Sequence, residues 1–315
     1  MSNSASEIIL HNYPQSPVAE KVRVILGIKG LSWSSVEIPR IPPKPMLTKL
    51  TGGYRRTPVM QIGADIYCDS QCIIRELERR FPSPTLFPSD KTGLLWCLSR
   101  WADGDFFDLV VKIVLGSNRE NLPADFAEDR GRLYLGPDWA AGLKEADEKL
   151  PHLVSQYRVV LSWLEQQLSD GRNFLLGNDV AAIDALVYYT VWFVRGRWDK
   201  GASFLSEFPH LERWETNVRD IGHGTISDMS PEQAIEIAGS STPIEISRDS
   251  KNDPQGLSEG MSVTVSPDVD GGEQPVEGQI VAVDAESITV SRSESDLGTL
   301  HVHFPRAGYK ITETS

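Results

Sequence analysis

The sequence predicts an α/β domain, then an all-α domain, then a small all-β, barrel-like domain. Three observations predict this fold class. Strand and helix signals alternate at first, helical periodicity follows, and short alternating runs separated by glycines fill the C-terminal segment. A stretch rich in Ser, Asp, Pro and Gly precedes that last segment. The predicted organisation is an α/β domain in residues 1–87, an all-α domain in 88–240, a linker in 241–258 and the barrel-like domain in 259–315.

The composition excludes several classes of protein. The chain of 315 residues carries 31 Lys and Arg against 44 Asp and Glu, a formal net charge of −13. A surface this acidic repels phosphate backbones, so we expect no nucleic acid partner. No apolar run approaches the roughly 18 residues of a bilayer-crossing helix, so no membrane span is expected. The N-terminus lacks a secretory signal and three cysteines cannot form a disulfide framework, so a cytoplasmic location is expected.

The α/β domain begins with a strand over residues 7–10. Ser16 is a good helix N-cap and Pro17 a good first helical residue, so a helix is expected from there to the stop at Gly30. Alternation over residues 33–38 predicts a second strand, and the strand–helix–strand order predicts a parallel crossover. The prolines that follow, at positions 42, 43 and 45, predict an irregular stretch.

The second half of this domain is a predicted hairpin followed by a helix. Residues 57–62 and 65–68 are its two strands. Asp69 and Ser70 can cap the next helix, which carries an apolar stripe. The order of elements is therefore βαβ followed by ββα.

The second segment repeats apolar residues at helical spacing. Residues 184–193 are apolar nearly all round, which predicts a central, buried helix. We expect the C-terminal barrel to be separable, so that a cut within residues 240–259 leaves a folded core. Most aromatic side chains of the helical segment must be core, and those that could instead line a pocket for a second substrate are Trp101, Phe106, Phe107, Trp192 and Trp198.

Ser16 is the first candidate for chemistry. It stands where a strand ends and a helix begins, and backbone N–H groups and the helix macrodipole favour an anion at such a place. Its hydroxyl could donate a hydrogen bond to a bound thiolate and so lower the pKa of that thiol. The same residue is also an ordinary N-cap, and the local pattern alone favours this second interpretation.

Thr57-Pro58 and Asp69-Ser70 are the other two candidates. Because only about 5–6% of X–Pro bonds are cis, the bare dipeptide favours a trans bond. A cis bond would instead turn the Thr57 backbone outward to pair with an extended peptide. Asp69 and Ser70 combine acceptors with a helix N-terminus, enough to hold an ammonium and a carboxylate, yet taken alone they are better interpreted as caps.

In order and spacing, these motifs resemble the thioredoxin-like half of the glutathione transferases, and the helical segment resembles their all-α half. The resemblance covers about residues 5–240 and implies a thioredoxin-like fold for the α/β domain. The C-terminal barrel-like domain lies outside this common two-domain pattern. The residues that carry the resemblance are Tyr13-Pro14-Gln15-Ser16-Pro17, Lys21-Val22-Arg23, Thr57-Pro58-Val59, Asp69-Ser70 with Ile73, and Gly177-Asn178-Asp179 with Asp184.

The resemblance implies roles for the residues around the first helix and the third strand. Ser16 matches the catalytic serine that hydrogen-bonds the glutathione sulfur, and Tyr13 is the reserve candidate. Thr57 matches the residue before the cis-proline, here Pro58, and its backbone would pair with the cysteinyl unit of glutathione. Arg56, one residue upstream, is expected at the glycyl carboxylate.

The resemblance extends to the two ends of the family pattern. Asp69 and Ser70 match the pair that binds the γ-glutamyl end of glutathione. The absence of a cysteine at position 16, and of a Cys-x-x-Cys pair there, argues against cysteine-type reductases and thioredoxin-like oxidoreduction. Ala181 stands three residues before Asp184, where the family usually has Ser or Thr, and we interpret Asp184 as structural.

The predicted function is that of a glutathione-dependent transferase, with glutathione as co-substrate, that directs the activated thiol at a small hydrophobic electrophile. Conjugation, isomerisation and dehalogenation are not distinguished. The alternative is a non-catalytic ligand-binding or scaffold protein of the same fold, with the barrel-like domain docking a partner. A homodimer is expected from the resemblance.

Two patterns in the C-terminal segment can each be interpreted as functional or as purely structural. His301 and His303 alternate on one face of a predicted strand, but two ligands without a third are too few, so no metal site is expected. Residues 303–309 place an aromatic pair beside a cation. That stretch fits either a docking surface or a plain strand–turn–strand.

Overall fold

The computed structural model describes residues 7–246, 253–269 and 271–314. The chain divides into two compact units. None of the helices in the described ranges combines the length and apolar character that crossing a membrane requires. The sheet unit comprises Met1–Val22, Leu31–Arg80 and Thr225–Ser315, and the helical unit comprises Arg23–Gly30 and Phe81–Gly224.

The N-terminal part of the sheet unit has the predicted order of βαβ then ββα, which confirms the thioredoxin-like fold class. Strand β1 pairs in parallel with β2, as a crossover connection through a helix requires. Strand β3 pairs antiparallel with both β1 and β4. The elements are β1 (Ile9–Asn12), α1 (Pro17–Ile28), β2 (Ser32–Glu37), β3 (Val59–Ile62), β4 (Asp65–Cys68) and α3 (Ser70–Arg80).

The proline-rich stretch, predicted to be irregular, contains a short helix, α2 (Pro45–Thr51). Pro45 occupies its first turn, where the missing N–H has no intrahelical partner to lose. Gly52, with φ at 80°, ends the helix in the left-handed conformation that glycine adopts without strain. The prediction holds for Pro42 and Pro43, which lie in irregular chain, and fails from Pro45 on, because proline starts a helix as readily as it interrupts one.

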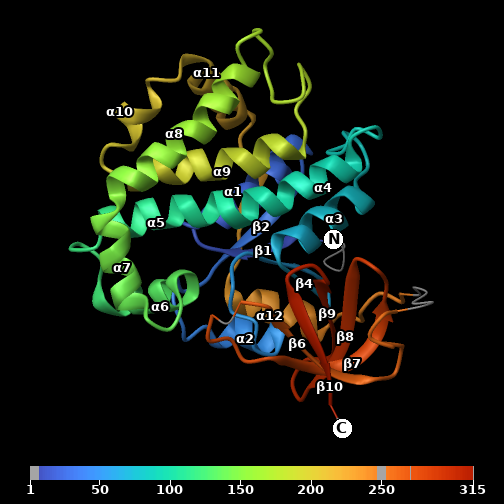
Figure 1. The fold of residues 1–315 in the computed structure, drawn as a ribbon. Helices are drawn as coiled ribbons and strands as arrows, with labels where there is room; N and C mark the ends of the chain where they lie inside the picture. The colour runs from blue at the N-terminus through green and yellow to red at the C-terminus, as the bar shows by residue number, and fades with distance from the viewer. Residues whose placement is uncertain (1–6, 247–252, 270, 315) are drawn as a thin grey trace. The chain divides into compact units, whose positions relative to one another are not determined.

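The C-terminal strands form the predicted small all-β domain and extend the same sheet. Figure 1 shows β6–β10 in orange and red, and β9 is the strand of this group next to β4 in the sheet. Among the described strands, β10 pairs only with β6, and β9 pairs in parallel with β4, so the predicted barrel is not closed. An edge strand exposes unpaired backbone N–H and C=O groups, which favour aggregation. Here β9 pairs with β4, so β4 is not an edge strand. These strands are β6 (Ser262–Pro267), β7 (Val276–Val283), β8 (Ser287–Glu294), β9 (Gly298–Pro305) and β10 (Tyr309–Glu313).

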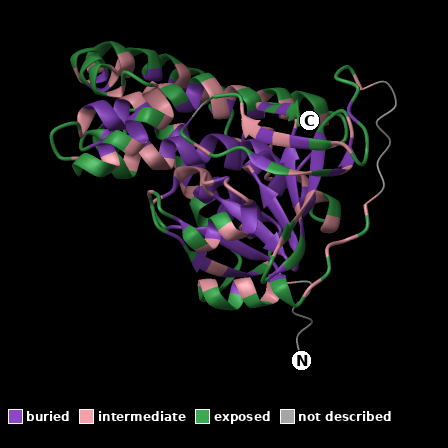
Figure 2. Ribbon diagram, turned by 90° about the horizontal axis from the view of Figure 1, so that it is seen from below, coloured by how far each residue is buried: buried purple, intermediate pink, exposed green. Residues whose placement is uncertain are grey.

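One hydrophobic core joins the C-terminal strands to the N-terminal part of the sheet unit. Val59 and Ile66 pack in the same cluster as Val265, Ile288 and Phe304, and all five are fully buried. Figure 2 shows the buried positions, in purple, along the strands. Removing the C-terminal segment would expose this core to water. The expectation that a cut in the linker leaves a folded core therefore does not fit the structure.

The compact units divide the chain differently from the predicted domains. Strand β5 (Thr225–Asp228), which pairs in parallel with β2, and helix α12 (Pro231–Gly239) belong to the sheet unit, although the prediction counts them with the all-α domain. Part of the predicted linker, residues 247–252, lies outside the described residues. The boundaries stay predictions, because grouping by contact does not test which segments fold alone.

The helical unit is all-α, as predicted. Its helix α9 is buried along most of its length, which confirms the central helix expected from the apolar run. A π-helical turn, Ala102–Phe106, joins the first two helices. The helices are α4 (Thr92–Trp101), α5 (Phe107–Ser117), α6 (Ala124–Leu135), α7 (Trp139–Glu148), α8 (Leu150–Gln167), α9 (Ala182–Arg197), α10 (Gly201–Leu205) and α11 (Pro209–Ile221).

Asp184 supplies one half of a capping box at the N-terminus of α9, and Ala181, at the N-cap, has no side-chain acceptor for the other half. Its Oδ2 accepts a hydrogen bond from the Ala181 N–H at 2.9 Å, at the N-terminus of α9. Its Oδ1 accepts from the Leu175 N–H and from Trp214 Nε1, each at 2.8 Å. Burial raises the pKa of Asp184, and these three donors oppose the shift. The geometry agrees with the interpretation of Asp184 as structural.

Candidate functional site

The register of the sheet gathers the predicted site residues at one end of the central strands. His11 in β1 lies opposite Val59 in β3, and Val59 lies opposite Cys68 in β4. The loop after β1, the segment before β3 and the loop after β4 therefore leave the sheet at the same end. These three segments carry the predicted residues Tyr13, Ser16, Arg56, Thr57, Pro58, Asp69 and Ser70.

Ser16 stands at the N-terminus of α1, where its Oγ accepts a hydrogen bond from the Ala19 N–H at 3.2 Å. This bond uses only an acceptor lone pair, so the hydroxyl retains its capacity to donate. The side chain is nonetheless only 2% exposed. Tyr13, in the same loop, is also buried. The Lys44 ammonium lies 5.8 Å from the centre of the Tyr13 ring. Both interpretations of Ser16, cap and thiol activator, are compatible with this geometry.

The Thr57–Pro58 peptide bond is cis, as the resemblance implied and the bare dipeptide did not. Thr57 Oγ1 accepts a hydrogen bond from Lys44 Nζ at 3.1 Å, and the same ammonium donates to the Arg55 carbonyl at 2.9 Å. Lys44 is a buried cation that the sequence analysis missed. It is a single lysine among prolines, so no spacing or periodicity marked it.

Asp69 and Ser70 open α3. Asp69 is the one residue other than glycine that has a positive φ, 75°, within the described ranges. Aspartate tolerates this left-handed conformation better than most residues because its short side chain bonds locally. Its Oδ1 accepts from the Gln71 N–H at 2.8 Å, and its Oδ2 accepts from the Tyr309 hydroxyl at 3.1 Å. Ser70 is buried at the start of the helix.

Arg56 contacts the C-terminal segment. Its Nε donates to the Glu273 carboxylate, and its Nη2 donates to the Val269 carbonyl at 2.6 Å. Burial disfavours the charge on Arg56, but the hydrogen bond to Glu273 and nearby negative charge outweigh it and hold the Arg56 pKa above its ordinary value. Glu273 is a partner that the sequence did not suggest, because the contact joins positions more than two hundred residues apart.

The stretch 303–309 resolves into a strand, a turn and a strand. Strand β9 ends at Pro305 and β10 begins at Tyr309. The Tyr309 hydroxyl meets Asp69 and also lies 3.2 Å from the Tyr54 hydroxyl. Tyr309, at the start of β10, therefore contacts residues of the N-terminal part of the sheet unit.

The comparisons with known proteins place this geometry in a family. Two sequence profiles match the chain, "Glutathione S-transferase, N-terminal domain" over residues 10–85 and "Glutathione S-transferase, C-terminal domain" over residues 138–216. A GST-like protein from Pseudomonas syringae, of known crystal structure, is 36% identical with a TM-score of 0.82, and the match covers 98% of this chain and 100% of that one. The chain belongs to the glutathione transferase superfamily. Members of this superfamily use glutathione as co-substrate.

More distant glutathione transferases share part of the chain. Glutathione S-transferase U4 from Arabidopsis thaliana is 19% identical over 70% of this chain and 88% of that protein. A Tau class glutathione S-transferase from mango, Mangifera indica, has the same fold at 17% identity and a TM-score of 0.51, over 74% of this chain and 97% of its own. Neither family profile reaches the C-terminal strands, whereas the Pseudomonas syringae match spans almost the whole chain.

A buried polar group holds β9 to β4 in this glutathione transferase-like chain. His303 Nε2 lies 2.8 Å from Asp65 Oδ1, and His303 Nδ1 lies 3.0 Å from Thr289 Oγ1. The His303 ring stacks on Tyr67 with centroids 4.3 Å apart. His301 Nδ1 lies 3.9 Å from the same Asp65 oxygen. Within the described ranges, no three or more His, Cys, Asp or Glu side chains are grouped so as to hold a metal ion.

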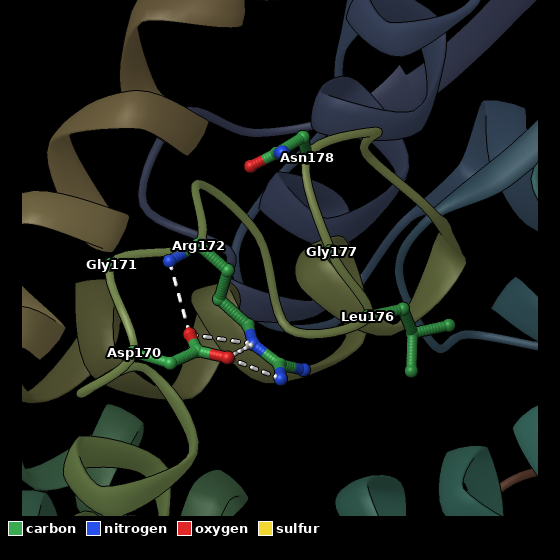
Figure 3. A pocket seen from close by; sticks show the side chains of 6 residues that line it. All are labelled: Asp170, Gly171, Arg172, Leu176, Gly177 and Asn178. Carbon is green, nitrogen blue, oxygen red and sulfur yellow. Dashed lines mark hydrogen bonds and ion pairs between the residues drawn. The ribbon is translucent and has the colours of Figure 1, made fainter.

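Four of the five aromatic residues proposed to line a second-substrate pocket pack against other aromatic rings of the helical unit. Trp101 stacks on Phe106 with centroids 4.9 Å apart, and Phe106 and Phe107 are buried. The helical unit does contain a pocket of about 370 Å³, but loop residues line it. Figure 3 shows the Asp170–Arg172 ion pair at its wall, and Arg172 lowers the Asp170 pKa to about 2. The lining residues are Asp170, Gly171, Arg172, Leu176, Gly177 and Asn178.

Proposed function

We propose that the protein is a glutathione-dependent transferase that activates the glutathione thiol through Ser16 and directs it at a small hydrophobic electrophile. The observation that carries this proposal is the common exit of three loops at one end of β1, β3 and β4. Ser16 stands in the first of these loops, with a hydroxyl that keeps its capacity to donate. A hydroxyl donor and the N-terminus of α1 would together stabilise a thiolate and lower the pKa of the thiol.

The remaining residues would hold the tripeptide in place. The Thr57 backbone, turned by the cis bond to Pro58, would pair with the cysteinyl unit. Asp69 would accept the γ-glutamyl ammonium, and Ser70 at the start of α3 would meet the γ-glutamyl carboxylate. Arg56 would meet the glycyl carboxylate. In the chemical step, the thiol gives its proton to solvent and the thiolate attacks the electrophilic carbon. The new carbon–sulfur bond forms as that carbon expels its leaving group or, for an activated double bond, as the π bond breaks and the neighbouring carbon takes up a proton.

A second candidate is a non-catalytic protein of the same fold, which binds a ligand or serves as a scaffold. Two observations favour it. Ser16 is only 2% exposed, and Arg56 and Asp69 already contact the C-terminal segment. In this case Ser16, Asp69 and Ser70 are helix caps and nothing more.

A titration of glutathione into the wild type and Ser16→Ala, read by calorimetry and by thiolate absorbance, distinguishes the two candidates. For the transferase, the wild type lowers the pKa of the bound thiol, Ser16→Ala abolishes that shift, and turnover with a model electrophile falls by about 100-fold. Ser230→Ala is the matched control, because Ser230 also caps a helix by accepting a bond from the Gln233 N–H, at 3.2 Å. It should cost similar stability and leave the thiol pKa unchanged. A Ser16→Ala protein with wild-type thiol pKa and turnover would remove the catalytic proposal, with Tyr13→Phe as the next variant.

Two further features of the proposal follow family precedent. We propose that the protein forms a homodimer, which sedimentation equilibrium of the full chain tests directly. We also propose a cytoplasmic location, which fractionation of cells expressing the full chain tests.

A further inference from the structure

The guanidinium of Arg56 is engaged on two sides by the C-terminal segment. Glu273 accepts from its Nε and the Val269 carbonyl accepts from its Nη2. The side chain of Arg56 remains 28% exposed, so it stands at the rim of the sheet unit and not in its interior. One arginine of the proposed glutathione site is therefore already paired with a carboxylate of the same chain.

Glu273 is held in this position by its surroundings. Its side chain is only 3% exposed, and its second carboxylate oxygen accepts from the Gly271 N–H at 2.9 Å. The neighbouring arginine, Arg55, donates to the Gly271 carbonyl. A Cβ on Gly53 would come within 2.9 Å of the Gln274 carbonyl oxygen, so the two backbones are closely apposed. We call Val269 and residues 271–274 the covering segment.

A ligand carboxylate and Glu273 would compete for the same cation. A guanidinium pairs with a carboxylate through its planar fork, and a second carboxylate that approaches the occupied fork meets a neutralised cation and a like charge. To reach Arg56, the incoming carboxylate must displace Glu273. The cost of that displacement weakens binding of a ligand that carries a carboxylate at this end.

We propose that Glu273 is a specificity-determining residue of the glutathione site, which competes with the glycyl carboxylate for Arg56 and so weakens the binding of glutathione. This inference rests on the proposed function, since it assumes that Arg56 faces the glycyl end. It adds a role for the C-terminal segment, to which the family profiles do not extend.

The other end of the proposed site shows the same arrangement. Tyr309 donates to Asp69 Oδ2, the oxygen that does not take the Gln71 N–H. A ligand ammonium would have to share that carboxylate with the Tyr309 hydroxyl. The hydroxyl is neutral, so its effect on binding should be smaller than that of the Glu273 carboxylate.

Calorimetric titration of the full-length protein with glutathione and with its glycyl ethyl ester tests the proposal. Glu273→Gln keeps the shape of the side chain and an acceptor for Gly271, but removes the negative charge. Glutathione should bind Glu273→Gln about tenfold more tightly than the wild type, while the ester, which lacks the charged carboxylate, should gain little. In an Arg56→Gln background the substitution should have no effect, because the contested cation is gone.

Glu286→Gln is the matched control. Glu286 pairs with Arg75 across the same junction, at a place away from the proposed site, so its loss removes the same charge and should leave both affinities unchanged. Equal or weaker glutathione binding by Glu273→Gln, with measurable binding by the wild type, would overturn the role of Glu273 and leave the proposed function standing. No glutathione binding by any of these proteins would overturn the proposed function itself, and the inference with it. Binding by Glu273→Gln alone would support both.

Discussion

The two ends of strand β4 meet the C-terminal segment through different chemistry. At the Asp65 end, the contact is fully buried, with Asp65, His303 and Thr289 in one chain of hydrogen bonds. At the Asp69 end, the contacts are partly buried, and they engage Arg56 and Asp69, two residues that the family pattern assigns to a ligand.

The difference teaches which contacts serve folding and which can serve binding. Burying a carboxylate is costly unless it is paired and hydrogen-bonded, so the contacts at the Asp65 end stabilise the fold. A partly buried contact with one accessible partner, such as Arg56 at 28% exposure, is easier to exchange for a ligand than a fully buried one. One junction thus secures the C-terminal segment at one end and leaves it exchangeable at the other.

The largest expected effect comes from removing the junction altogether. Deletion of residues 253–315 should abolish the cooperative folded state of the sheet unit, because it exposes Val59, Ile66 and the edge of β4. The loss would be comparable to the whole stability of a domain, about 5–15 kcal/mol. Circular dichroism and denaturant unfolding of the truncated chain measure it. A soluble truncated protein with wild-type stability would show that the shared core is dispensable.

Next in size is the loss of the Asp65 carboxylate. Asp65→Ala leaves His303 Nε2 and the Ile244 N–H without their acceptor, and should cost about 3 kcal/mol of unfolding free energy in urea. Glu286→Gln, at the exposed Arg75 pair, should cost less than about 0.5 kcal/mol. Similar costs for the two substitutions would erase the contrast between a buried and an exposed contact.

The smallest expected effect is a pH dependence at the Asp65 end. Burial lowers the pKa of His301 below its ordinary value of 6.5, although Asp65 opposes the shift. The unfolded chain then binds this proton more readily than the folded chain, so stability is present above pH 6.5 and is lost as pH falls below it. His301→Gln should reduce the slope of this part of the profile in urea unfolding followed across pH 6.5. Part of the slope should remain, because burial also lowers the pKa of His11, to about 4. An unchanged profile would mean that other groups set the dependence.

Local signals in the sequence predicted the elements and the loops of the site. Ser16-Pro17 and Asp69-Ser70 start helices as their capping chemistry requires, and alternation marked β3 and β4. These predictions succeed because each depends on neighbours in sequence.

Long-range pairing was beyond the reach of the same reasoning. Nothing in β4 or β9 specifies that they pair with each other, and so the C-terminal strands were expected to close on themselves. Lys44, Glu273 and Tyr309 reach the site from an unexpected helix and from the far end of the chain. Their positions depend on tertiary contacts, which no local pattern encodes.

Hydrogen exchange of the full-length protein with and without saturating glutathione tests the central claim most directly. If glutathione displaces the covering segment from Arg56, the Gly271 N–H loses its bond to Glu273, and exchange at residues 271–274 becomes faster in the bound protein. Exchange near Pro58 and at the start of α3 becomes slower, because the ligand covers that end of the sheet. Unchanged or slower exchange at residues 271–274 in the saturated protein would contradict the account.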